Sequence, residues 1–251
     1  MLFNSFTVTS ENGCYFYPLP DKAPFIAALT LKGVDADEEI ARHASEGPFV
    51  LLSQVHGTKI VCAENARRYP ETDQADGLLI TQDSVQCGLR YADCAPVLIL
   101  SLSDPPLILA LHSGFRGTLN NIVAAAMKFA QEKCGNFSQE NLYAWVGPCI
   151  CRRCYSRKTD DPITSEALEK FLPEAAVRGN GLVYFDLKRQ IAEQLFDEGV
   201  PADHIYIESQ CTYEQHSIFH SHRRWCLSKK GRDMRMLLTV KTKKTESAVI
   251  I

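Results

Sequence analysis

The chain has 251 residues, of which 45% are hydrophobic, 23% charged and 9% aromatic. This composition is typical of an ordinary globular protein and excludes disordered, collagen-like and coiled-coil chains. The 27 Lys and Arg residues and 30 Asp and Glu residues give a formal net charge of −3, which argues against nucleic acid as the main partner. A chain of this length buries a large core, and we expect a single domain over residues 1–251.

Apolar segments and cysteine content together indicate the compartment. The longest apolar stretches, 96–102 and 107–111, are far shorter than the ~20 residues needed to cross a bilayer, so we expect no membrane partner. Residues 1–10 contain no basic side chain and no long apolar run, so we expect no secretory signal and a cytoplasmic protein. In that compartment ten cysteines favour free thiols, metal ligands or a nucleophile over disulfides.

Short, nearly continuous apolar runs predict strands that are covered on both faces. In chain order, the predicted strands are 49–55, 59–63, 77–81, 85–91, 96–102, 107–112, 142–146, 204–208, 217–221 and 234–240. One helix is predicted at 118–134, ending at Gly135, and another between Asp186, which caps it, and Gly199, which ends it. The tail 241–251 has few apolar anchors and is expected to fray. The irregular insertion of helices favours an α+β fold, a mixed β-sheet sandwich with flanking helices.

Three segments each place a metal-binding side chain at the end of a predicted strand or in the turn after it. His56 lies in Q-V-H-G at 54–57, Cys94 in A-D-C-A-P at 92–96, and His112 in H-S-G-F-R-G at 112–117. Strand ends are where functional sites are commonly built. One thiolate and two imidazoles suit Zn²⁺ or a copper ion, and three protein ligands leave a fourth position for water or substrate.

These segments belong to a longer ordered set of motifs. In chain order the set is Q-V-H-G (54–57), A-D-G (75–77), A-D-C-A-P-V (92–97), H-S-G-F-R-G (112–117), G-P-C-I (147–150), C-T-Y (211–213) and S-H-R-R (221–224). No single motif is specific, but together, over roughly residues 50–240, the sequence resembles the multicopper polyphenol oxidoreductase, or laccase-like, family. Members of that family are also described as purine nucleoside phosphorylases and, in bacteria, as a peptidoglycan editing factor.

The resemblance implies an α+β sandwich shared with a group of proteins regarded as cysteine hydrolases, and a zinc ion held by His56, Cys94 and His112. It also implies phosphorolysis of adenosine and inosine to ribose 1-phosphate and free base, with adenosine deamination as a second activity. The expected partners are therefore a purine nucleoside and phosphate, and we expect a monomer or a weak homo-oligomer. A zinc ion lowers the pKa of a bound water toward ~7, which suits attack at the amino-bearing C6 of adenine.

Further side chains are expected to bind the substrates. The predicted substrate-binding residues are Gln54, Arg116, His222, Arg223 and Arg224. Arg116 is the first choice as a phosphate ligand, because it follows His112 closely and its planar guanidinium matches phosphate oxygens. Asp93 is expected to orient a metal-binding imidazole or to act as a base. The candidate catalytic residues are therefore Asp93, Cys94, His112 and Arg116.

Three other functions remain open at this point. In a Cys-His hydrolase, Cys94 is the nucleophile, His112 the base and Asp93 or Gln54 the orienting group, which suits amidase-like editing of a peptidoglycan precursor. A copper-dependent polyphenol oxidase fits poorly, because the chain has seven His and a single His-x-His pair. A scaffold protein with a structural metal would need a fourth protein ligand.

Two more clusters contain metal-binding side chains. Cys149, Cys151 and Cys154 have the spacing C-x-C-x-x-C, but a structural zinc normally takes four ligands. No nearby fourth ligand is evident, so free thiols are the favoured interpretation. The second cluster consists of His216, His220 and His222. These are interpreted as polar residues at a strand end whose imidazoles are hydrogen-bonded.

Overall fold

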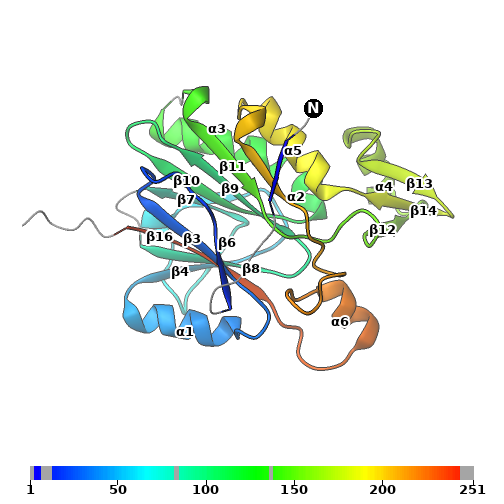
Figure 1. The fold of residues 1–251 in the computed structure, drawn as a ribbon, viewed down its shortest axis with the longest axis horizontal. Helices are drawn as coiled ribbons and strands as arrows, with labels where there is room; N and C mark the ends of the chain where they lie inside the picture. The colour runs from blue at the N-terminus through cyan, green and yellow to red at the C-terminus, as the bar shows by residue number, and fades with distance from the viewer. Residues whose placement is uncertain (1–2, 7–12, 82–84, 136–137, 244–251) are drawn as a thin grey trace, which may run out of the picture.

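The structure is a computed structural model that describes residues 3–6, 13–81, 85–135 and 138–243. Within these residues the chain forms two large mixed β-sheets, one small sheet and six α-helices (Figure 1). The α+β class and the β-sheet sandwich expected from the sequence are therefore confirmed.

The first large sheet has seven strands among the described residues. Their order is β1 (Asn4–Phe6), β15 (Ile205–Glu208), β11 (Leu142–Val146), β9 (Ala95–Ser101), β10 (Leu107–Ser113), β7 (Gly77–Thr81) and β5 (Ile60–Cys62). Neighbouring strands from β11 to β7 are antiparallel, whereas β15 pairs in parallel with both β1 and β11. All residues of β9 and β10 are buried, as expected for strands covered on both faces.

Of the other two sheets, the six-stranded one combines strands of the first half of the chain with β16 near its end, and the small one is formed within residues 156–185. The six-stranded sheet has the order β2 (Cys14–Phe16), β3 (Phe25–Thr30), β16 (Met236–Thr242), β8 (Gln86–Tyr91), β4 (Phe49–Ser53) and β6 (Asp73–Gln74). The small sheet has the order β12 (Ser156–Lys158), β14 (Leu182–Phe185) and β13 (Ala176–Gly179). The helices are α1 (Ala36–Glu46), α2 (Phe115–Leu119), α3 (Ile122–Cys134), α4 (Pro162–Lys170), α5 (Leu187–Asp197) and α6 (His222–Ser228).

Successive residues of the central strands point to opposite faces and so join two different cores. Leu109 and the strand side chains that point the same way pack against α2, α3 and α5. Ile108 and the strand side chains that point the opposite way pack against the six-stranded sheet. Ile40 of α1 covers the outer face of that second sheet, in contact with Phe49 and Leu237. The molecule therefore has four layers, with α3 and α5 on one side and α1 on the other (Figure 1).

The connection from β8 to β9 determines where a site can form. Because β8 belongs to the six-stranded sheet and β9 to the seven-stranded sheet, residues 92–94 cross between the two sheets. The loop after β4 and the end of β10 lie at the same edge. Three segments that are distant in sequence thus meet where the sandwich opens.

Most of the predicted elements are present. The six predicted strands between residues 49 and 112, and the strand at 142–146, correspond to β4, β5, β7, β8, β9, β10 and β11. The predicted strands at 204–208 and 234–240 correspond to β15 and β16, and the helix predicted after Asp186 corresponds to α5. Several of these elements have a long apolar run or a clear apolar stripe. The prediction missed β3, although its residues 25–29 are all apolar.

Three of the predicted elements need correction. The helix predicted at 118–134 is two helices, because Asn121 adopts a left-handed conformation with φ 54° and its side chain accepts a hydrogen bond from the N–H of Ala124. The strand predicted at 217–221 is wrong: these residues form turns, and Ser221 caps α6. The predicted loose tail begins too early, since β16 continues to Thr242; residues 244–251 lie outside the described part of the chain.

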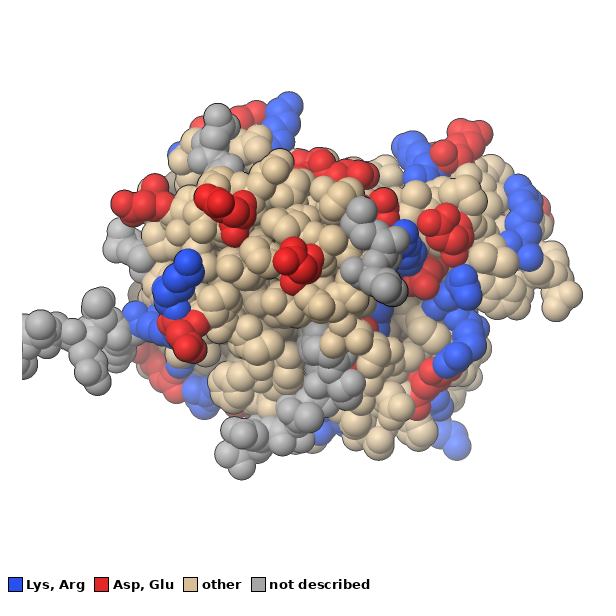
Figure 2. All heavy atoms as spheres, turned by 45° about the horizontal axis from the view of Figure 1, so that its top comes forward, with Lys and Arg blue, Asp and Glu red and all other residues tan. Residues whose placement is uncertain are grey.

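The surface carries charges of both signs. On the face that Figure 2 presents, Lys and Arg side chains are interspersed with Asp and Glu side chains, as the small net charge leads one to expect. Across the described part of the chain, none of the helices combines the length and the apolar character that a membrane crossing requires.

Candidate functional site

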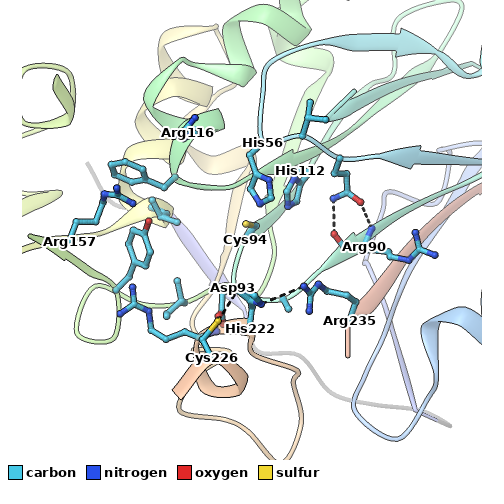
Figure 3. A pocket seen from close by; sticks show the side chains of 18 of the residues that line it. His56, Arg90, Asp93, Cys94, His112, Arg116, Arg157, His222, Cys226 and Arg235 are labelled. Carbon is cyan, nitrogen blue, oxygen red and sulfur yellow. Dashed lines mark hydrogen bonds between the residues drawn. The ribbon is translucent and has the colours of Figure 1, made fainter. Parts of the chain in front are cut away.

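His56, Cys94 and His112 lie together at the edge where the sandwich opens. One ring nitrogen of each histidine and Sγ of Cys94 all lie within 4.8 Å of one another. The two imidazole centroids are 4.9 Å apart, with their planes at 71°, and Figure 3 shows both rings next to the thiol. The structure thus brings together the three residues that the sequence predicted as ligands, and this donor set fits zinc or copper.

Asp76 holds two of these residues in place. Nδ1 of His112 donates to Oδ1 of Asp76 at 2.9 Å, and the backbone N–H groups of Val55, His56 and Gly57 also donate to the Asp76 carboxylate. The carboxylate is fully buried, and all its partners are polar groups of the site. A buried carboxylate bonded to an imidazole in this way fixes the ring orientation and the tautomer.

The same contacts control the protonation of Asp76. Burial by itself raises the pKa of this carboxyl group, but hydrogen bonds from His112 and from the N–H groups of Gly57 and His56 outweigh it. The net effect is a pKa below the usual value. Asp76 is therefore ionised and remains an acceptor for His112.

Cys94 and His112 shift each other's protonation. Burial raises the pKa of the Cys94 thiol, but the attraction of His112 and hydrogen bonds from both histidines lower it to about 6. Burial lowers the pKa of His112, yet the Cys94 charge and the Asp76 hydrogen bond raise it to about 9. A thiolate is the form of cysteine that binds metals and acts as a nucleophile.

Gly114 provides the space for this cluster. A Cβ atom at position 114 would lie 2.7 Å from Sγ of Cys94 and 3.2 Å from Cδ2 of His56. Real Cβ atoms do not approach other heavy atoms at the shorter distance. Glycine is required here for steric reasons, and its φ of −83° places no further demand on it.

The cluster lies on the wall of a cavity of about 970 Å³. The cavity contains the five arginines Arg90, Arg116, Arg157, Arg223 and Arg235 in its lining. Its other polar or aromatic lining residues include Gln54, Asp93, Phe115, Tyr155 and His222. In Figure 3 Arg116 and Arg157 lie on one side of the His56, Cys94 and His112 cluster, and Arg90 and Arg235 lie on the other. The cavity therefore combines cationic groups with an aromatic wall.

Asp93 lines the cavity but contacts neither imidazole. Its Oδ1 accepts from the Thr212 hydroxyl at 2.7 Å, and its Oδ2 accepts from the Ser221 hydroxyl and the N–H of Arg223. Asp93 thus fastens the start of α6 to the crossover between the sheets. The carboxylate that orients His112 is Asp76, which the sequence reasoning did not single out for this role.

The predicted substrate-binding residues have different surroundings. Gln54 exchanges two hydrogen bonds with the backbone of Arg90, so its amide is already engaged. Arg116 and Arg223 line the cavity, whereas Arg224 is absent from the lining. Arg224 instead donates to the carbonyl oxygen of Tyr213 and covers the Tyr213 ring.

His222 also lines the cavity and is held at both ring nitrogens. Its Nδ1 lies 2.8 Å from Asp233 and its Nε2 lies 3.3 Å from Sγ of Cys226. Tyr155 and Arg157 are lining residues that the sequence reasoning missed. Arg157 lies in β12, which pairs with β14, and Tyr155 directly precedes that strand.

The fold and the site define an α+β sandwich protein with a cluster of two histidines and one cysteine at the crossover of its two large sheets. Residues 33–240 match the family described as multi-copper polyphenol oxidoreductase laccase, and the chain belongs to this family. It is similar to purine nucleoside phosphorylase YlmD of Geobacillus stearothermophilus, with 30% identity over 187 residues, covering 70% of this chain and 67% of that protein. It is also similar to adenosine deaminase RL5 of an unknown prokaryotic organism, with 26% identity over 217 residues, covering 79% of this chain and 75% of that protein.

Solved structures agree with the fold. The crystal structure of YlmD from Geobacillus stearothermophilus matches with a TM-score of 0.79 and 24% identity, covering 94% of this chain and 99% of that chain. In sequence, two further relatives named purine nucleoside phosphorylase, from Rickettsia conorii and Bacillus subtilis, are matched over only 53% and 58% of their own lengths.

Proposed function

We propose that the protein is a zinc-dependent purine nucleoside enzyme that cleaves adenosine and inosine with phosphate and also deaminates adenosine. The observation that carries this proposal is the position of His56, Cys94 and His112 on the wall of a 970 Å³ cavity with five arginines. A nucleoside and a phosphate ion fit a cavity of this size. The names of two relatives, purine nucleoside phosphorylase and adenosine deaminase, support the same substrate class.

His56, Cys94 and His112 are the residues that would hold the zinc ion. When bound, zinc supplies a Lewis acid and a lowered pKa for water. Asp76 keeps the proton of His112 on Nδ1, which leaves Nε2 as the nitrogen available to a metal. We assign zinc rather than copper, although the donor set suits both, because neither proposed reaction transfers electrons.

Arg116 is the proposed phosphate ligand. Among the described residues its guanidinium forms no hydrogen bond or ion pair, whereas the guanidinium of Arg157 is paired with Asp161 and that of Arg223 donates to the carbonyl oxygen of Ser156. A guanidinium without a protein partner can give two parallel hydrogen bonds to phosphate. Tyr155 and Phe115 also line the cavity. The guanidinium of Arg223 lies over the Tyr155 ring and that of Arg157 over the Phe115 ring, so a purine would pack against a mixed aromatic and guanidinium wall.

Multicopper oxidation is not part of the proposal. All seven histidines lie in the described part of the chain, and only His56 and His112 belong to a group of metal-binding side chains there. His43 is bonded to Gln86 and His204 is stacked on Tyr143. A blue-copper site already needs two histidines and a cysteine, which leaves too few imidazoles together for a second copper centre.

The test is incubation of purified protein with adenosine, with and without phosphate, followed by chromatography of the products. We expect adenine and ribose 1-phosphate only when phosphate is present, and inosine in both cases. His112→Ala should abolish both products together with metal binding at the cluster of His56, Cys94 and His112. Metal-loaded protein that forms none of these products would overturn the proposal.

One observation favours a second candidate, a Cys-His hydrolase. Cys94 contacts His112, and His112 is hydrogen-bonded to Asp76, as in a catalytic triad of nucleophile, base and orienting residue. Asp76 thus occupies the orienting position for which the sequence suggested Asp93 or Gln54. This enzyme would cleave an amide, such as that of a peptidoglycan precursor, without a metal. Activity on an amide that persists in strong chelator and is lost on alkylation of Cys94 would support this candidate over the nucleoside enzyme.

A further inference from the structure

A second group of metal-binding side chains lies outside the cluster of His56, Cys94 and His112. It consists of Cys151, Cys154, Cys211 and Glu214, whose sulfur atoms and one carboxylate oxygen all lie within 4.8 Å of one another. The sequence interpretation of free thiols rested on the lack of a fourth ligand near Cys149. The fold supplies two further ligands from a segment about sixty residues away, and Cys149 is not among the four.

The four side chains come from two turns with the same spacing. Cys151 and Cys154 are three residues apart, as are Cys211 and Glu214. In the first turn the N–H of Cys154 donates to the carbonyl oxygen of Cys151, and in the second the N–H of Gln215 donates to the carbonyl oxygen of Cys211. Paired turns in which ligands are separated by two residues are the usual construction of structural zinc sites.

The backbone holds the two turns together independently of any ligand. Cys149 and Cys211 form an isolated parallel bridge, and the N–H of Thr212 donates to the carbonyl oxygen of Cys149 at 3.2 Å. The N–H of Cys151 points at Sγ of Cys211 at 3.3 Å. The sulfur of Cys211 is therefore held against the backbone of the first turn.

The distance between Cys154 and Glu214 fits a tetrahedral ion. With zinc–sulfur bonds of about 2.3 Å and zinc–oxygen bonds of about 2.1 Å, the edges of a tetrahedron measure roughly 3.6–3.8 Å. Sγ of Cys154 lies 3.5 Å from Oε1 of Glu214, close to the sulfur–oxygen edge. Glu214 is also bound by the guanidinium of Arg153, and a carboxylate has enough lone pairs to bind an arginine and a metal together.

We propose that Cys151, Cys154, Cys211 and Glu214 form a second, structural zinc site that fastens two walls of the cavity to each other. Tyr155, next to Cys154, lines the cavity, and Thr212, next to Cys211, bonds to Asp93. Four protein ligands leave no open position, so this zinc does not take part in chemistry. The proposal does not depend on the function proposed above.

Zinc content per chain tests the proposal, measured by mass spectrometry of protein purified in the presence of reductant. We expect two zinc ions in the wild-type protein and one in His112→Ala, which keeps only the second site. Combining His112→Ala with Cys151→Ser and Cys154→Ser should remove the remaining ion. Cys134→Ser, a matched control outside both clusters, should leave two.

Two further measurements keep the test decisive if the double cysteine variant is unstable. Glu214→Gln retains three thiolates, and we expect its second zinc to be lost at a lower chelator concentration than in the wild type. In His112→Ala protein, bound zinc should protect Cys151, Cys154 and Cys211 from alkylation. A zinc content of zero in His112→Ala, or equal alkylation with and without zinc, would overturn the proposal, as would a disulfide among these cysteines in zinc-loaded protein.

Discussion

Nδ1 of His112 and Oδ1 of Asp76 lie 2.9 Å apart, and both side chains are almost fully shielded from solvent, at 5% and 0% exposure. Asp76 also accepts backbone N–H groups on both of its oxygens. In Asp76→Asn one of these accepting oxygens is replaced by an NH₂ group. Two donors then face each other, and at least one hydrogen bond of the site is lost. We expect zinc affinity to fall by about 10- to 100-fold, the usual effect of losing such a partner.

Competition with a chelating dye measures this effect. Asp73→Asn is the matched control, because Asp73 accepts a backbone N–H of Arg67 at the protein surface, away from the cluster. Unchanged zinc affinity in Asp76→Asn, with the fold intact by circular dichroism, would contradict the role assigned to Asp76.

The role of Asp76 was not predicted from the sequence, although Asp76 lies in the A-D-G motif at 75–77, whereas that of His112 was predicted. His112 ends an apolar run, and a polar side chain at a strand end is visible in the sequence. Asp76 reaches His112 only because β7 pairs with β10 in the register that places Gly77 opposite Leu111. Long-range register of this kind has no local signal. The same reason hides the neighbourhood of Cys151 and Cys211.

The strands and helices likewise divide into those that the sequence predicted and those that it did not. Strands β9 and β10 are buried on both faces, so their apolar runs predicted them. In α1 only Ala36, Ile40 and His43 are buried, and α6 has no buried residue. Helices with so little apolar surface depend on caps and tertiary contacts, which a hydrophobic pattern does not reveal.

Gly114→Ala tests whether the three-residue cluster is the functional centre. The added methyl group would lie 2.7 Å from Sγ of Cys94, so it must displace the thiol or the loop that carries His56. We expect loss of zinc binding at this cluster and of nucleoside turnover, with little change in the far-ultraviolet spectrum. Gly179→Ala is the control, since its nearest contact would be an ordinary 3.7 Å. Full activity in Gly114→Ala would show that the cluster is not needed.

Arg116→Ala separates the two proposed activities. Phosphorolysis needs bound phosphate and deamination does not, so we expect the KM for phosphate to rise by about 10- to 100-fold, as for a lost charged hydrogen bond of ~1.5–3 kcal/mol, while inosine forms at the wild-type rate. Arg116→Lys should give an intermediate KM because the charge remains but the planar fork is lost. Arg178→Ala, an exposed arginine on β13, should change neither activity. Equal loss of both activities would assign Arg116 a different role.

The surroundings of His43 should make the free energy of unfolding depend on pH. Its ring is 8% exposed and stacks on Phe49 with centroids 5.4 Å apart. Nδ1 donates to Oε1 of Gln86 at 2.7 Å, and Nε2 faces the guanidinium of Arg42 at 3.0 Å. Burial is the main reason that the pKa of His43 lies below its ordinary value, and the charge of Arg42 adds to it.

The sign of the effect follows from proton uptake in the two states. Below about pH 6.5 the unfolded chain binds a proton at position 43 that the folded protein resists. The free energy of unfolding should therefore decrease as the pH is lowered. The total decrease is ~1.4 kcal/mol for each unit by which the pKa of His43 in the folded protein lies below that in the unfolded chain, and it levels off below the folded pKa. Urea denaturation between about pH 5 and pH 7.5 measures the slope. His43→Phe keeps the ring stacking but cannot titrate, so its slope should be smaller; an unchanged slope would mean that another group is responsible.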